Sequence, residues 1–366
     1  MSKYMSQYKA SDLLNKLSKK GFINDGDEDI NRFIIEQQQD KELPLYLRAL
    51  VGVGAFIASL CFIGFIAIGM EIREEEGFVI AGLVLIALAI GLQKLGGGGH
   101  TIKGSFYMQS SFALMATGKT LFTFGMAEIL GSGWGATIAL LVITAATYHI
   151  YRMSVDRFLS TFAVLFSILV NVLWDREFAG SRELLFNGFI LLQILGAAVL
   201  ITNVKIKRDY IPMTYGILFS LCTSALFLAS YTKFGYWRHE EYINPIFVSL
   251  LFTGSLVASI IWFVGGVRKI NTETSRLACL GAVLMGVISA PGIILSIILM
   301  VLGYAKHEKI MVTMGALLVP VFLFFYYYNL DISLMEKSGV LVGSGITLLV
   351  GRFYIGFKGW DKGGNA

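Results

Sequence analysis

Residues 244–265 read NPIFVSLLFTGSLVASIIWFVG, a run without a single charged side chain. A helix rises 1.5 Å per residue, so about 20 apolar residues cross the roughly 30 Å hydrocarbon core of a bilayer. Comparable runs recur at about 49–70, 77–93, 105–127, 134–151, 157–174, 183–203, 210–231, 309–329 and 337–356. The pattern predicts an all-α, polytopic transmembrane helical bundle of about 11–12 membrane segments.

The composition agrees with this prediction. Hydrophobic residues make up 55% of the 366-residue chain and charged residues only 15%, against about 25% charged in a typical soluble domain. The net charge of +5 comes from residues that lie mostly between the apolar runs, so it reflects membrane topology and predicts no nucleic-acid partner. The expected surroundings are a lipid bilayer.

Three regions follow from the charge pattern. Residues 1–48 form a polar head with two short amphipathic helical patterns, residues 49–358 form the membrane bundle, and residues 359–366 form a short tail. Four acidic residues of the head fit a calcium-loop spacing, but Ile30 occupies the position that requires glycine, so no calcium site is expected. The head is predicted to be cytoplasmic.

The stretch 277–304 is ambiguous because Pro291 and Gly292 interrupt it. It forms either one kinked helix or a broken, re-entrant hairpin of two half-helices. With a hairpin, 23 basic residues lie on the cytoplasmic side and 6 on the other; with a kinked helix the division is 19 against 10. The positive-inside rule therefore favours the hairpin, with both the N-terminus and the tail cytoplasmic.

Lys119 lies near the middle of the apolar run 105–127. An intramembrane charge costs roughly 2.5–3.5 kcal/mol on insertion scales, so it needs a partner or a route to water. Glu128 falls on the opposite face of the same helix. Lys119 is thus a candidate binding or gating charge, and the alternative is that its side chain extends to the membrane interface. Removing the charge is expected to be tolerated unless a partner is left behind.

No constellation typical of an enzyme or a cofactor site stands out. The GKT triplet at 118–120 lacks the upstream glycine of a phosphate loop. The four histidines lie in loops or at helix ends, without the pairing that metal sites use. We expect no enzyme, no cofactor and no metal, partly because only one interior titratable group is visible. Four amides at or near membrane depth favour interhelical hydrogen bonds over a lined pathway: Gln109, Asn171, Asn187 and Gln193.

The densest polar constellation lies between 322 and 345. Three consecutive tyrosines project in different directions around a helix, and a short connection then brings charged residues together at one membrane face. We expect Lys337 to pair with a carboxylate there and a tyrosine hydroxyl to join it. An aromatic belt with a salt-bridged turn is the alternative to a functional site. The candidate residues are Tyr326, Tyr327, Tyr328, Asp331, Glu336, Lys337 and Ser338.

SAPGIILSIILMVLGYAKHEKIMVTMG, residues 289–315, and YYYNLDISLMEKSGVLVGSG, residues 326–345, resemble the C-terminal signature of the membrane family named domain of unknown function 4401. Ser333 and Met335 replace its usual threonine and leucine. The signature positions are Pro291, Gly292, Tyr326, Tyr327, Tyr328, Leu330, Lys337 and Ser338. The resemblance implies a multi-pass protein of the inner (plasma) membrane of Gram-negative bacteria, often encoded beside a protein of the GDYXXLXY type. It implies no known reaction.

Two functions remain open. The first is a non-enzymatic integral membrane component that acts with a membrane or periplasmic partner, such as a GDYXXLXY-type protein. The alternative is a transporter of a small solute or ion that uses Lys119 and the interior amides. A water-accessible cavity at Lys119 would favour transport.

Overall fold

The computed structural model describes residues 75–96, 102–175, 179–202, 210–231, 243–266 and 273–329, with isolated positions elsewhere. The predicted head, 1–48, the predicted segments at 49–70 and 337–356, and the tail lie outside these stretches. Within the stretches the chain is helical and contains no strand. The helices are α4 (Glu75–Leu95), α5 (Ile102–Leu130), α6 (Gly133–Ile150), α7 (Ser154–Trp174), η1 (Ala179–Ser181), α8 (Arg182–Thr202), α9 (Ile211–Tyr231), α10 (Pro245–Val264), α11 (Glu273–Ile288), α12 (Pro291–Lys306) and α13 (Lys309–Asn329).

Among the described residues, seven helices are long and apolar enough to cross a membrane: α4, α6, α7, α8, α9, α10 and α13. α5 is longer, at 29 residues, whereas α11 and α12 have 16 residues each. The predicted fold class is confirmed, and the protein is a polytopic helical membrane bundle. The observed boundaries differ by only a few residues from those expected from hydropathy.

Local capping signals explain several of these boundaries. The Ser132 side chain accepts a hydrogen bond from the Gly135 amide at 3.1 Å and starts α6. Asn244 does the same for the Ile246 amide at 3.0 Å, and Pro245 occupies the first position of α10, where the missing N–H has no partner to lose. Gly265 ends α10 in the left-handed conformation, with φ of 95°.

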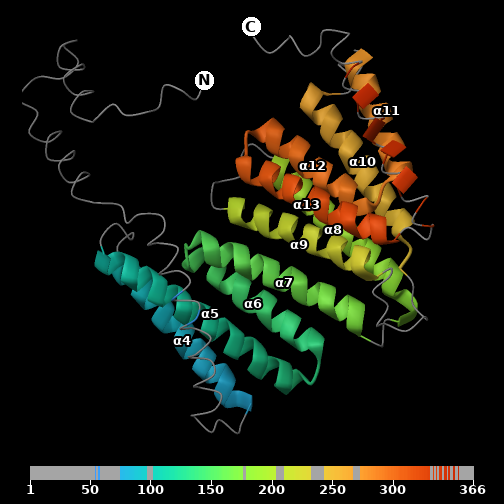
Figure 1. Ribbon diagram of the computed structural model, residues 1–366. Coiled ribbons are helices and arrows are strands. Elements are labelled where there is room, and N and C mark those ends of the chain that lie inside the picture. The colour runs from blue at the N-terminus through green and yellow to red at the C-terminus, as the bar shows by residue number, and fades with distance from the viewer. Residues whose placement is uncertain are drawn as a thin grey trace, which may run out of the picture. The chain divides into compact units, whose positions relative to one another are not determined.

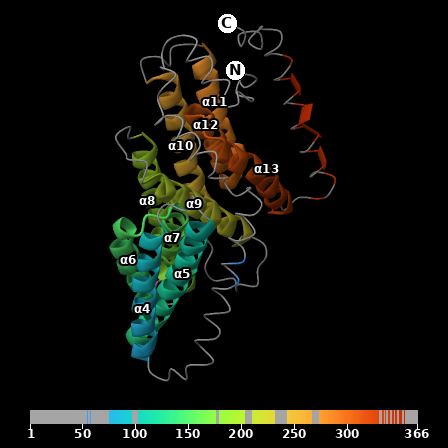
Figure 2. The ribbon, with the colours of Figure 1, turned by 90° about the vertical axis from the view of Figure 1, so that its left-hand side faces the viewer.

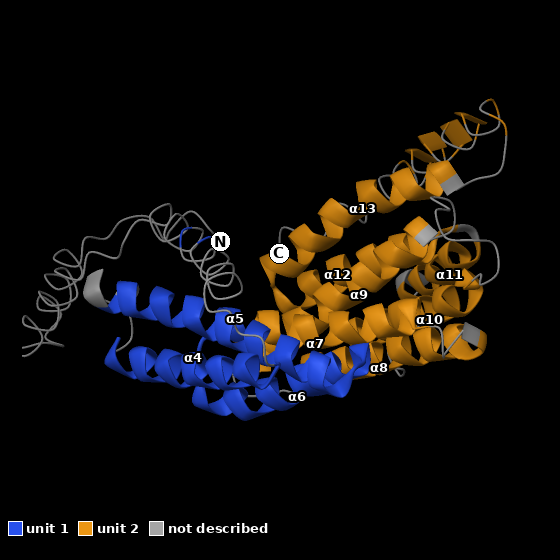
Figure 3. Ribbon diagram, turned by 90° about the horizontal axis from the view of Figure 1, so that it is seen from below, with its two compact units in different colours: residues 1–156 blue, residues 157–366 orange. Residues whose placement is uncertain are grey.

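The chain divides into two compact units, residues 1–156 and 157–366 (Figure 3). In the first unit, α4 and α5 lie side by side and α6 packs on α5 (Figures 1 and 2). Their interface buries Ile86 and Ala89 of α4, Met115 of α5 and Ile143 of α6. Asp156, in the first turn of α7, closes this unit.

In the second unit, α12 packs against α13, and α10 packs against both α11 and α12. Ile294 and Leu299 of α12, Phe252 of α10 and Phe322 of α13 are almost completely buried there. Gly292 leaves the space that the Phe322 ring occupies, since a Cβ at Gly292 would overlap that ring. This contact gives the glycine of the signature a packing role.

The chain reverses direction at Pro291. α11 ends at Ile288, and Pro291 is the first residue of α12. Ser275 in the first turn of α11 and Tyr304 near the end of α12 line the same groove, which two halves of one continuous helix would place far apart. The two short helices therefore form an open hairpin. The cytoplasmic placement of the termini stays a prediction.

Candidate functional site

Lys119 is buried in the first unit, with 6% of its surface exposed. Its Nζ donates to both carboxylate oxygens of Asp156, at 2.9 Å to Oδ1 and 2.7 Å to Oδ2. Asp156 is 4% exposed. The lysine side chain thus ends on a buried carboxylate.

Helix lengths explain how two residues 37 positions apart meet. α5 has 29 residues and α6 only 18, about 43 Å and 27 Å of helix. The connection after α6 therefore packs partway along α5, and the first turn of α7 begins beside its middle. Side chains on a helix slope toward its N-terminus, so the lysine stem points from α5 toward that connection.

A small hydrogen-bond network fixes the position of the connection. Ser111 Oγ on α5 donates to the Ala89 carbonyl on α4 at 2.7 Å, and the Tyr151 hydroxyl lies 3.0 Å from Ser111 Oγ. Since the serine proton is used on Ala89, Tyr151 donates to Ser111. Tyr151 lies between α6 and α7 and is fully buried, and its burial raises the pKa of the hydroxyl to about 12. The hydroxyl therefore keeps its proton at physiological pH.

Next to the ion pair, α4 and α5 pack closely against each other. A Cβ at Gly82 would lie 2.7 Å from the Gly118 carbonyl oxygen, and a Cβ at Gly118 would lie 2.8 Å from the Gly82 carbonyl oxygen. Only glycines allow the two backbones to approach this closely. Because Gly118 precedes Lys119, this crossing sets the rotation of α5 that points Lys119 toward Asp156.

The pair has zero net charge and is largely shielded from solvent, which lowers the local dielectric and strengthens the attraction. It is suited to holding the connection after α6 against α5, or to exchanging a proton when the first unit opens. Within the described stretches, no three His, Cys, Asp or Glu side chains gather as a metal site requires.

Asp156 was missed by sequence reasoning, and the expectation of a single interior titratable group was wrong. The sequence places Asp156 in a basic connection, and hydropathy starts the next helix at 157, whereas α7 begins at Ser154. An aspartate in the first turn of a helix is favoured by the helix dipole, so its position in the sequence does not by itself indicate a buried partner. One signal in the sequence could have led to Asp156: a lysine within an apolar run needs a compensating carboxylate.

The interior amides behave differently from one another. Both amide atoms of Gln193, which is 2% exposed, lack a hydrogen-bond partner. Asn187 Oδ1 and Gln109 Oε1 are also buried without a partner. A buried amide without a partner is unfavourable by about 1–3 kcal/mol. Asn171, in contrast, takes part in an interaction.

The three tyrosines of the signature lie in the last turn of α13. Two of them, Tyr327 and Tyr328, form an aromatic surface together with Phe324. The rings of Phe324 and Tyr328 are 4.5 Å apart, and those of Tyr327 and Tyr328 are 5.7 Å apart. Phe324 and Tyr328 are 52% and 51% exposed. Tyr326 is partly buried and has an interaction of its own.

The structure describes only part of the polar constellation between 322 and 345. Asp331, Glu336 and Lys337 lie outside the described residues, so the predicted Lys337 ion pair stays a prediction. Ser338 is exposed, and its Oγ donates to the Met335 carbonyl at 2.8 Å. The structure thus describes the three tyrosines and Ser338, and it places Lys119 in the other unit.

Residues 44–356 match the model of the family described as "Domain of unknown function (DUF4401)". No curated protein matches the chain. No solved structure matches it either.

Proposed function

Since the chain belongs to the family of domain of unknown function 4401, we propose that it is a non-enzymatic component of the bacterial inner membrane that acts together with a membrane or periplasmic partner of the GDYXXLXY type. The observation that carries this proposal is the exposed aromatic surface of α13. Phe324 and Tyr328 stand on the outer face of the helix, while Phe322 packs inward on α12.

Two properties of this surface support partner binding. Exposed aromatic side chains of this kind are the usual anchors of protein interfaces, because they bury much area for few rotatable bonds. The surface also ends at the signature tyrosines, at the end of α13 that the charge pattern predicts to be periplasmic. A partner in the membrane or periplasm would meet it there.

The test is co-purification with a named partner. We expect Tyr328→Ala to weaken binding of a co-expressed GDYXXLXY-type protein about thirtyfold, since an aromatic anchor contributes about 2 kcal/mol. Affinity is measured with both proteins purified in detergent. Leu317→Ala is the matched control, because Leu317 is 67% exposed on the same helix, three turns away, and its loss should leave affinity unchanged. Equal affinity of the Tyr328→Ala and wild-type proteins would refute the proposal.

Transport is the second candidate function, and the Lys119–Asp156 pair favours it. A buried ion pair inside a membrane helix bundle is the kind of arrangement in which proton movement is coupled to helix opening. The side chains are enclosed in the described state, so transport would require the first unit to open.

Proton flux distinguishes the two candidates. In proteoliposomes loaded with a pH-sensitive dye, a transporter should acidify the lumen under a proton gradient, and the Lys119→Met/Asp156→Leu double variant should abolish this flux. A control with Glu76→Gln, an exposed carboxylate in α4, should retain it. If proteoliposomes with the wild-type protein showed the same proton flux as empty liposomes, proton transport would be refuted.

A further inference from the structure

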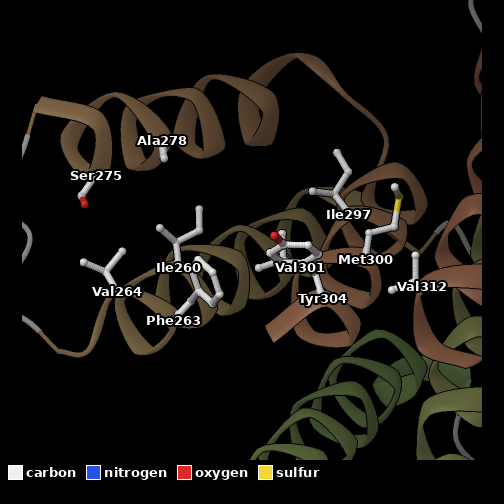
Figure 4. A pocket seen from close by; sticks show the side chains of 10 residues that line it. All are labelled: Ile260, Phe263, Val264, Ser275, Ala278, Ile297, Met300, Val301, Tyr304 and Val312. Atoms are coloured by element: carbon white, nitrogen blue, oxygen red, sulfur yellow. The ribbon is translucent and has the colours of Figure 1, made fainter. Parts of the chain in front are cut away.

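A groove of about 620 Å³ opens in the second unit between α10, α11 and α12, with one edge on α13 (Figure 4). Apart from Ser275 and Tyr304, its lining carries only hydrocarbon and thioether side chains. Figure 4 shows side chains of α11 facing those of α10 and α12 across the groove. The lining residues are Ile260, Phe263, Val264, Ser275, Ala278, Ile297, Met300, Val301, Tyr304 and Val312.

The dimensions of the groove limit what can occupy it. Its volume falls in the range of small-molecule sites, about 300–1,000 Å³. From Tyr304 to Ile297 it is about 10 Å deep, which is roughly two-thirds of the 15 Å hydrocarbon thickness of one leaflet. A helix with its side chains is about 10 Å across, so 10 Å of helix would need roughly 800 Å³. The groove therefore suits an acyl chain better than a helix of another protein.

Aromatic and basic side chains mark the mouth of the groove. Lys306 Nζ lies 5.0 Å from the centre of the Trp262 ring, a cation–π contact. Next to it, the rings of Phe263 and Tyr304 are 6.2 Å apart. Aromatic belts with lysines are typical of the level of the lipid headgroups, so this end lies at the membrane interface.

The charge around the mouth is positive. Lys306 ends α12, Lys309 begins α13 and Arg276 lies in the first turn of α11. Two acidic residues occupy the same helix ends: Glu273 begins α11, and Glu308 accepts a hydrogen bond from the Tyr215 hydroxyl at 3.2 Å. Basic residues thus outnumber acidic ones at the end of the groove that the charge pattern predicts to be cytoplasmic.

We propose that this groove binds one bilayer phospholipid with an anionic headgroup. One acyl chain lies between α10, α11 and α12, and the phosphate lies near Lys306 and Arg276. Basic pockets between membrane helices on the cytoplasmic side are suited to such headgroups, because each nearby lysine or arginine contributes about fivefold to their affinity. The site is independent of the partner surface on α13.

The test uses the full-length protein, purified in detergent and supplied with equal amounts of palmitoyl-oleoyl phosphatidylglycerol and phosphatidylcholine. Native mass spectrometry then reports the lipids that remain bound. We expect the wild-type protein to retain phosphatidylglycerol preferentially. The Arg276→Gln/Lys306→Gln variant should retain it about 25-fold less strongly, with phosphatidylcholine retention unchanged.

A second variant tests the groove itself. Ala278→Phe fills it from α11 and should reduce retention of both lipids, whereas Leu280→Phe, which alters an exposed residue of the same helix, should have no effect. Equal retention of the two lipids by the wild-type protein would overturn the proposal, as would unchanged retention by Ala278→Phe. A wild-type dimer that Ala278→Phe converts to a monomer would overturn it too, because a second copy would then cover the groove.

Discussion

Asp156→Asn is expected to destabilise the protein by about 3–5 kcal/mol, because it leaves the Lys119 ammonium buried without its carboxylate. Lys119→Met should have a similar effect, since it leaves Asp156 buried without the ammonium. The sequence analysis expects removal of this charge to be tolerated unless a partner is left behind, and Asp156 is such a partner. Both effects are measured as the fraction of detergent-purified protein that stays monodisperse after heating.

The double variant separates the ion pair from general damage at the two positions. Lys119→Met/Asp156→Leu should recover most of the lost stability, because apolar side chains of similar size often replace a buried pair without penalty. Glu76→Gln removes an exposed carboxylate and should leave stability unchanged. If the two single variants were as stable as the wild type, the pair would contribute nothing to the fold.

Gly82→Ala is expected to destabilise the protein by about 1–3 kcal/mol, because the new Cβ would meet backbone atoms of α5. It would lie 2.7 Å from both the Gly118 carbonyl oxygen and the Phe122 amide nitrogen. Backbone atoms cannot turn aside as the end of a side chain can, so α4 must move away from α5. Thermal unfolding in detergent, followed by circular dichroism, measures the loss.

Gly91→Ala on the same helix is the matched control. A Cβ at Gly91 has no atom within 4 Å, and alanine is favoured over glycine inside a helix by up to about 1 kcal/mol. This variant should be as stable as the wild type or slightly more stable. Equal stability of the Gly82→Ala and Gly91→Ala variants would contradict the close crossing of α4 and α5.

Much of the secondary structure was predictable because its signals are local. The run at 244–265 needs no neighbour to identify it as a membrane helix, and Asn244, Pro245 and Gly265 mark its ends. The same reasoning placed α8 within one residue of its observed bounds. At α7 the local signal failed, since the polar Ser154 and Asp156 belong to the helix although hydropathy excludes them.

The sequence by itself determined that the protein is a multi-pass helical bundle, because the free energy of placing a segment in hydrocarbon depends on that segment's own composition. It also determined that Lys119 needs a compensating group. Only the tertiary structure identified that group as Asp156, 37 residues away. The choice depends on the rotation and depth of α5, which the crossing at Gly82 and Gly118 sets, and on the shorter length of α6. The groove beside Lys306 likewise exists only because α10, α11 and α12, each a separate apolar helix in sequence, pack with a gap between them.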